Sequence, residues 1–215
     1  MPPTKTQVAQ SLLEIRAVSF NPQTPIRFQS GILSPVYVDN RRLIAHPTQW
    51  QIVIEGFRAL ITQETLPFTV IAGIAVGGVP HSSVLAYTLH VPSVFIRKEA
   101  KGHGAKKQIE GGEVAHQHAL LIEDLVTTGE SSLRGVEILR KDGATVTDVL
   151  TIVSYGFPDT LKTFAKNNVR LHTLTDFPTV VQVALNRGIL GSSESAVIND
   201  WVSDPYHWAE RHGLA

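Results

Sequence analysis

Two adjacent carboxylates followed by a run of hydroxyl groups form the most chemically distinctive segment of this chain. Residues 120–132 read Leu-Leu-Ile-Glu-Asp-Leu-Val-Thr-Thr-Gly-Glu-Ser-Ser. Carboxylates such as Glu123 and Asp124 accept hydrogen bonds from the vicinal hydroxyls of a sugar. A loop of amides and hydroxyls that contains Gly129 and leads into a helix binds a phosphate. The segment therefore predicts a site for a sugar phosphate.

Each of these residues also has an ordinary structural interpretation. An acid at the end of a strand caps a turn, and hydroxyl side chains cap helices. The complete run of acids, hydroxyls and glycine favours a binding site over this alternative. The chain has no Gly-Lys-Ser/Thr sequence of a P-loop, and no Gly-x-Gly-x-x-Gly fingerprint falls in a predicted strand-to-helix turn.

Basic residues and glycines are concentrated in a second segment, residues 97–112, which reads Arg-Lys-Glu-Ala-Lys-Gly-His-Gly-Ala-Lys-Lys-Gln-Ile-Glu-Gly-Gly. Cations on a glycine-bearing loop suit a lid that closes over an anionic leaving group such as pyrophosphate. A solvated basic hairpin explains the segment equally well when it is taken alone. Beside a sugar-phosphate loop, the lid is the favoured interpretation.

Composition excludes several classes of protein. The 215 residues include no cysteine, so disulfides, thiol catalysis and thiolate metal sites are excluded. Lysine plus arginine equal aspartate plus glutamate at 19 each, so no global charge attracts nucleic acid. The N-terminus lacks the apolar core of a signal peptide, and no apolar run approaches the length of a membrane span. We expect a cytoplasmic protein with no nucleic-acid or membrane partner.

Strand-like and helix-like segments alternate through most of the chain. Expected strands cover residues 69–74, 93–96, 119–122 and 145–153, with strand and turn over 26–39. Expected helices cover residues 6–18, 80–89, 131–141 and 178–187, and a further helix opens at Pro47 and carries an apolar stripe to Ile61. Apolar strands alternating with helices predict an α/β fold with a mainly parallel central sheet flanked by helices.

The chain shows no repeat and no low-complexity linker. We therefore expect one domain over residues 1–215. The N-terminal segment, about residues 1–45, and the C-terminal tail are expected to pack together or beside the sheet.

Residues 120–132 resemble the phosphoribosyl-pyrophosphate (PRPP) motif of type I phosphoribosyltransferases. The basic segment narrows the resemblance, because Arg-Lys-Glu-Ala-Lys-x-His-Gly followed by Gln-Ile-Glu-Gly is similar to the catalytic loop of the orotate phosphoribosyltransferase family. Further matches occur in residues 28–41, 72–81, 154–158 and 200–208. The resemblance thus extends from about Phe28 to Trp208.

The resemblance implies a type I phosphoribosyltransferase fold whose chain ends form a small hood. It implies Mg²⁺-dependent transfer of ribose 5-phosphate from PRPP to orotate in pyrimidine biosynthesis, giving orotidine 5′-phosphate and pyrophosphate. A homodimer with shared active sites is implied as well. Mg²⁺ is expected to bind through PRPP oxygens without a protein ligand set of its own.

The resemblance also assigns roles to individual residues. The implied catalytic residues are Arg97, Lys101 and His103. Thr127 is implied to reach orotate. The implied PRPP contacts are Arg97, Lys98, Lys101, His103, Glu123, Asp124, Leu125, Val126, Thr127, Thr128, Gly129, Glu130 and Ser131.

Some positions depart from the pattern of the family. Cationic residues that members of the family carry are replaced by Gln29, Leu33, Gly77 and Tyr155. Other cations must then meet the anionic groups of the substrates, and Arg41 or Arg42 is the expected source.

Glu130 is a second kind of departure, because it stands where a small residue is common and its carboxylate would repel a phosphate. We expect its side chain to point outward and the backbone to bind.

Two other functions are compatible with a PRPP motif. One is transfer to another base, and the other is PRPP binding by a regulator without catalysis. The presence of Arg97, Lys101 and His103, together with zero net charge, favours catalysis over regulation.

Overall fold

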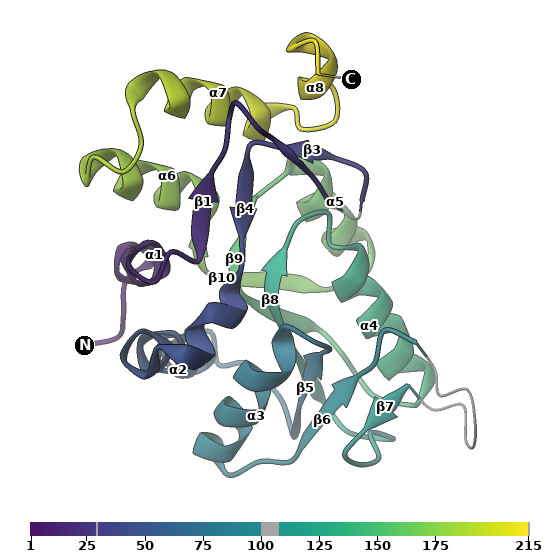
Figure 1. The fold of residues 1–215 in the computed structure, drawn as a ribbon. Coiled ribbons are helices and arrows are strands. Elements are labelled where there is room, and N and C mark those ends of the chain that lie inside the picture. Colours follow the sequence, from purple (N-terminus) through teal and green to yellow (C-terminus); the bar gives the residue numbers. More distant parts are fainter. Residues whose placement is uncertain (29, 100–107, 215) are drawn as a thin grey trace.

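A computed structural model describes residues 1–28, 30–99 and 108–214. These residues form a six-stranded sheet in the order β10-β9-β8-β5-β6-β7 (Figure 1). All neighbouring pairs are parallel except β6 and β7, which are antiparallel. The strands are β5 (Val70–Ile74), β6 (Ser93–Ile96), β7 (Ile109–Glu110), β8 (Ala119–Val126), β9 (Asp148–Ser154) and β10 (Arg170–Asp176).

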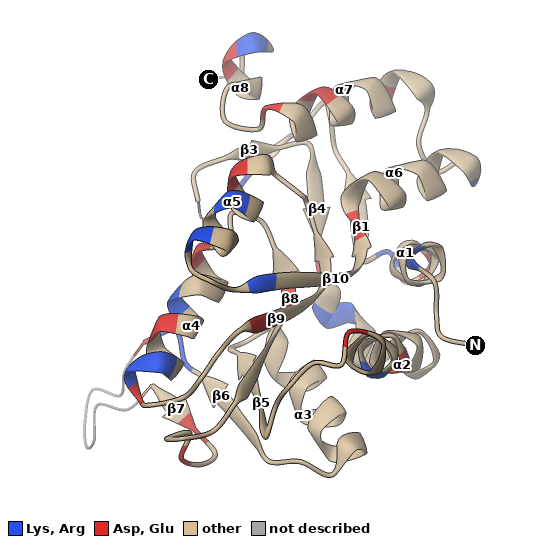
Figure 2. Cartoon of the chain, turned by 180° about the vertical axis from the view of Figure 1, so that it is seen from behind, with Lys and Arg blue, Asp and Glu red and all other residues tan. Residues whose placement is uncertain are grey.

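Helices cover both faces of the sheet. Successive residues of a strand point to opposite faces, so each central strand contributes side chains to two cores. Leu120 and Ile122 of β8 pack in the core that includes α1 (Lys5–Glu14), α2 (Pro47–Gln63), α3 (Gly78–Leu89) and α6 (Phe177–Asn186). Ala119 and Leu121 pack in the other core, with α4 (Glu130–Lys141) and α5 (Pro158–Lys166). Figure 2 shows β5 and β6 without charged residues, whereas α4 and α5 carry both signs. The predicted mainly parallel α/β fold is confirmed.

The expected strand 119–122 was too short. Strand β8 continues to Val126, because β9 pairs with it in register beyond Ile122, with Glu123 opposite Thr151 and Leu125 opposite Val153. The two acids therefore belong to the strand rather than to the loop after it. Strand β10 and helix α5 were missed, since β10 is an edge strand whose sequence, Arg-Leu-His-Thr-Leu-Thr-Asp, lacks a continuous apolar run.

Segments from both chain ends pack together beside the sheet. Short strands β1 (Val18–Phe20) and β4 (Val36–Val38) pair antiparallel, as do β2 (Ile26–Arg27) and β3 (Leu33–Ser34). The indole Nε1 of Trp201, on α7 (Ser192–Ser203), donates to the Leu33 carbonyl at 3.0 Å. Trp201 is fully buried within an aromatic cluster that also contains Phe28, Tyr155, Phe157 and Phe177.

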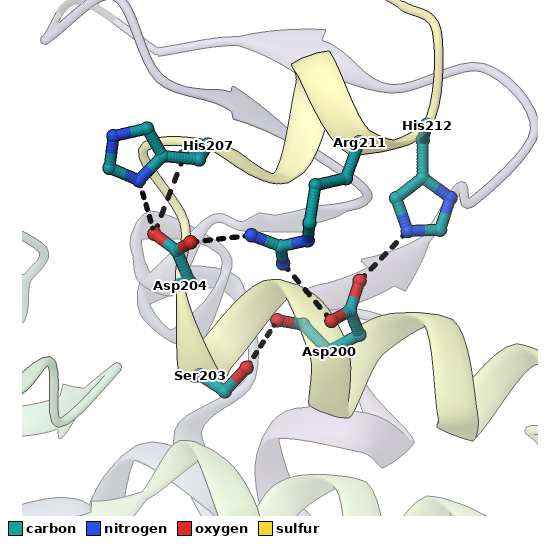
Figure 3. A network of polar contacts seen from close by, with 6 residues as sticks. All are labelled: Asp200, Ser203, Asp204, His207, Arg211 and His212. Carbon is teal, nitrogen blue, oxygen red and sulfur yellow. Dashed lines mark hydrogen bonds and ion pairs between the residues drawn. The ribbon is translucent and has the colours of Figure 1, made fainter.

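A polar network attaches the last helix, α8 (Trp208–Arg211), to the end of α7 (Figure 3). Arg211 contacts both Asp200 and Asp204, and His212 Nε2 lies 2.8 Å from an Asp200 oxygen. His207 Nδ1 lies 2.9 Å from Asp204. These contacts hold the segment around Trp208, whose side chain is fully buried. Across the described residues, no helix has the length and apolar character needed to cross a membrane.

A buried acid joins β9 to β10 at the start of both strands. Asp148 is 1% exposed and accepts hydrogen bonds from Arg170, from Thr147 Oγ1 at 2.7 Å and from His172 Nε2 at 2.7 Å. Burial alone would raise the pKa of Asp148, but these partners outweigh it and hold the pKa below its usual value.

Replacing Asp148 with asparagine is expected to lower the free energy of unfolding by about 2–4 kcal/mol at pH 7. The amide lacks the charge and the second acceptor oxygen. The pKa of Asp148 is lower in the folded protein than in the unfolded chain. Its ionised carboxylate therefore contributes its full stabilisation at pH values above the unfolded-state pKa, and this contribution is lost as pH falls through the folded-state pKa.

Urea unfolding at pH 7 and at pH 3.5 tests this expectation, with the exposed Asp142→Asn as the control. A difference between wild type and Asp148→Asn that failed to shrink at the lower pH would contradict the assigned role.

Candidate active site

A cavity of about 920 Å³ opens at the carboxyl ends of β5, β6 and β8. This is the edge at which open α/β sheets bind ligands. Residues from three parts of the chain line it: the chain-end segment (Phe28, Ser30, Val38, Asp39, Arg41), the ends of β5 and β6 (residues 74–77 and 96–99), and residues 123–132 with Arg134, Gly135 and Ile138 of α4.

The two acids lie side by side on β8 but engage different neighbours. Glu123 is 5% exposed, and one of its oxygens accepts from Ser131 Oγ at 3.2 Å and Ser132 Oγ at 3.5 Å. The Asp124 carbonyl accepts from Asn40 Nδ2 at 2.6 Å. The Asp124 carboxylate lies against Gly77, where an added Cβ would collide with it. The absence of a side chain at Gly77 therefore leaves room for this acid.

Burial raises the pKa of both acids. It raises the pKa of Glu123 well above the ordinary value, and the neighbouring Asp124 carboxylate raises it further. Burial also raises the pKa of Asp124, while hydrogen bonds and the Arg41 guanidinium act in the opposite direction. A ligand that brings hydroxyl donors or a cation would therefore stabilise the ionised pair.

The loop after β8 forms a cradle of backbone donors at the start of α4. Gly129 has φ of +83°, and a Cβ there would lie 2.5 Å from Phe164 Cε2, so both backbone and space require glycine. The Thr127 carbonyl accepts from Thr160 Oγ1 at 3.0 Å, which fixes the loop to α5. Gly129, the N-cap of α4, has no side chain to cap the helix, and residues 129–132 line the cavity, so the first amides of α4 are candidate donors to an anion bound there.

The structure brings most of the predicted site residues together. Residues 123–131, Arg97 and Lys98 all line the cavity. Lys101 and His103 lie outside the described residues. The backbone amide of Arg97 donates to the Gln108 carbonyl at 2.9 Å, which fixes the Arg97 backbone. Its side-chain Nη1 lies 3.5 Å from Glu110 Oε1.

The departures from the family pattern occupy different places. Gly77 lines the cavity, Tyr155 is buried in the aromatic cluster, and Gln29 lies outside the described residues. Arg41 lines the cavity, whereas Arg42 Nε donates to the Ile15 carbonyl at 2.9 Å and is not part of the lining.

The sequence did not predict the roles of two residues, Arg134 in the cavity lining and Asn40 beside it, and it left the orientation of Glu130 open. Arg134, one helical turn after Glu130, lines the cavity; a basic residue at i+4 from the acid was the available signal. Asn40 contacts the Asp124 backbone, a role with no local signal. Glu130 is exposed and also belongs to the lining, so its outward orientation stays a prediction.

Comparisons with known proteins agree on the class. The signature of the phosphoribosyl transferase domain matches residues 46–184. Orotate phosphoribosyltransferase from Coxiella burnetii is 40% identical over 94% of this chain and 97% of its own length. The protein of that name from Listeria innocua is 37% identical over 95% of this chain and 98% of its own length.

Solved structures share the fold. Orotate phosphoribosyltransferase from Aeropyrum pernix superposes with a TM-score of 0.73 at 29% identity, covering 86% of this chain and 99% of the other. The UMP synthase of Leishmania donovani superposes with a TM-score of 0.80 at 24% identity, covering 92% of this chain and 42% of that longer protein, which shows the likeness of fold alone.

A parallel sheet with an acid pair and a hydroxyl loop at its carboxyl edge, within a matched domain, defines a phosphoribosyl transferase. The relatives that match nearly the whole chain are orotate phosphoribosyltransferases, and they identify the family within this class. The chain belongs to the orotate phosphoribosyltransferase family.

Proposed function

We propose that this protein transfers the ribose 5-phosphate group of PRPP to orotate, giving orotidine 5′-phosphate and pyrophosphate in pyrimidine biosynthesis. The observation that carries the proposal is the buried pair Glu123 and Asp124 beside the amide-and-hydroxyl loop, in one cavity. Relatives of 37–40% identity that bear the name of this activity support it.

The reaction exchanges one bond at the anomeric carbon. A ring nitrogen of orotate loses its proton and donates its electron pair to that carbon as the bond to pyrophosphate breaks. Pyrophosphate leaves with the bonding pair, and the proton passes to pyrophosphate or to solvent. In this proposal Glu123 and Asp124 accept from the ribose hydroxyls, and the loop through Ser131 binds the 5′-phosphate. Alignment of the two reactants and stabilisation of the developing charge supply the rate enhancement.

In this proposal, orotate and the pyrophosphate group of PRPP contact different residues. Thr127, at the start of the loop, faces orotate. Arg97 and Lys98, which line the cavity at the end of β6, bind pyrophosphate together with Lys101 and His103. Similarity of residues 97–112 to the family's catalytic loop supports this assignment for the last two.

Mg²⁺ fits the oxygen-rich donor set of this site. Among the described residues, no group of three or more His, Cys, Asp or Glu side chains could hold a metal ion. We propose that Mg²⁺ is bound mainly by PRPP oxygens. Bound there, the ion would neutralise charge on the leaving pyrophosphate.

The proposal includes an assembly and a location. A homodimer in which the basic segment of one subunit reaches the site of the other follows from the resemblance of that segment. The chain ends, packed together around Trp201, are proposed to form the hood over the base. A cytoplasmic location is proposed on the same ground, and a chain without cysteine suits it.

The activity is tested by offering the purified protein PRPP and Mg²⁺ with orotate, uracil, adenine or hypoxanthine. Orotate absorbance is expected to fall with stoichiometric release of pyrophosphate, and the other bases are expected to persist. Consumption of another base in place of orotate would overturn the substrate. Binding of PRPP without consumption of any base would indicate a regulator.

A further inference from the structure

The short helix η1 (Asn40–Ala45) carries an arginine to the rim of the cavity. Asn40 binds the Asp124 backbone, which fixes the start of the helix beside the acid pair. The Asp39 carboxylate caps the helix by accepting from the Arg41 amide at 3.3 Å. The contacts of Asn40 with Asp124 and of Asp39 with the Arg41 amide therefore fix the position of the Arg41 backbone.

The guanidinium of Arg41 is also held in one orientation. Its Nε donates to Asp39 Oδ1 at 2.6 Å, and its Nη2 donates to Tyr37 Oη at 3.3 Å. In the described part of the chain, Nη1 makes no further hydrogen bond. Because a guanidinium has five N–H groups in one plane, donors remain for a bound anion. The side chain is 55% exposed and accessible to a ligand.

Arg41 comes from a different segment of the chain than the other described cations in the cavity lining. Arg97 and Lys98 follow β6, and Arg134 belongs to α4 beside the loop proposed to hold the 5′-phosphate. Arg41 instead comes from the chain-end segment, together with Phe28.

That segment has the character needed to bind a planar base. The Phe28 ring packs against Tyr155 and Trp201, with centroids 5.8 and 6.2 Å away, so it is a firmly supported apolar wall. Val38 adds a second apolar residue to the lining. A planar pyrimidine that bears a carboxylate requires apolar contact for the ring and a fork of N–H donors for the charge.

We propose that Arg41, oriented by Asp39 and Tyr37, binds the carboxylate of orotate and thereby selects this base. The inference rests on the proposed function and adds the residue that distinguishes orotate from an uncharged pyrimidine. Arg42 does not take this role, because it is not part of the cavity lining and its Nε donates to the Ile15 carbonyl.

Arg41→Ala is expected to raise the KM for orotate about ten- to hundredfold, the value of a hydrogen bond between charged groups. The KM for PRPP is expected to change less than about threefold. Arg58→Ala, which removes an exposed arginine of α2 outside the cavity, is the matched control and should leave both constants unchanged. Initial rates over a grid of both substrate concentrations supply these numbers.

A second measurement uses an orotate analogue whose carboxylate is replaced by a carboxamide. Wild type should prefer orotate over the analogue, and Arg41→Ala should lose most of that preference. An unchanged preference, or a rise in the KM for PRPP alone, would overturn the inference even if wild type converts orotate. Failure of wild type to consume orotate would instead refute the proposed function.

Discussion

Replacing Lys101 with alanine is expected to lower kcat a hundredfold or more while PRPP binding is partly retained. A preorganised donor that neutralises developing charge contributes about this much to turnover. Binding survives in part, since residues 123–131 form a separate group of contacts in the cavity. Steady-state turnover of PRPP and orotate, with PRPP affinity measured by calorimetry, tests both halves of the expectation.

Lys166→Ala, at an exposed position on α5 outside the cavity, is the control for loss of a positive charge. His103→Ala provides an independent test of the same segment and should also reduce kcat. Unchanged turnover in Lys101→Ala would refute the assignment of residues 97–112 as the catalytic lid.

Replacing Glu123 with glutamine is expected to reduce kcat/KM a hundredfold or more and, at the same time, to stabilise the protein. Activity falls because an ionised acceptor for the ribose hydroxyls is lost. Stability rises because the neutral amide avoids the cost of a buried charge beside Asp124. A gain of about 1–2 kcal/mol would raise the Tm by about 2–8 °C for a chain of this size.

The pH dependence of that gain has a definite sign. Burial raises the native pKa of Glu123 above its unfolded value, so the wild type is relatively most stable at low pH and loses stability as pH rises through the native pKa. The stabilisation by Glu123→Gln should therefore be largest at pH 8 and should shrink as pH falls.

Thermal unfolding of wild type and Glu123→Gln at several pH values measures this dependence. The exposed Glu130→Gln is the control, with no comparable effect on stability expected. A lower Tm for Glu123→Gln at pH 8 would contradict the inference that the buried Glu123 carboxylate destabilises the protein.

Local chemistry was sufficient to find the centre of the candidate site. The Glu123–Ser131 run combines types of residue that act together over a short distance, so the sequence places them together without tertiary information. Periodicity also predicted β6 at residues 93–96 and α4 within one residue of its observed start. These elements have strong apolar patterns and clear boundaries.

The same reasoning failed where pairing rather than composition decides the structure. The end of β8 contains two acids and appears polar, but pairing with β9 keeps it in the sheet to Val126. Strand β10 mixes polar and apolar residues because it lies at an edge, and only its parallel register with β9 defines it.

The sequence by itself determined the residue types of the candidate site: an acid pair, a loop proposed to bind phosphate and a basic segment, with a mainly parallel sheet to hold them. Tertiary structure alone decided which neighbouring side chain reaches the cavity. Arg41 and Arg42 are identical in type and adjacent in sequence, but a 3₁₀ helix with three residues per turn separates their directions by about 120°. One therefore lines the cavity, while the other binds the carbonyl that follows α1.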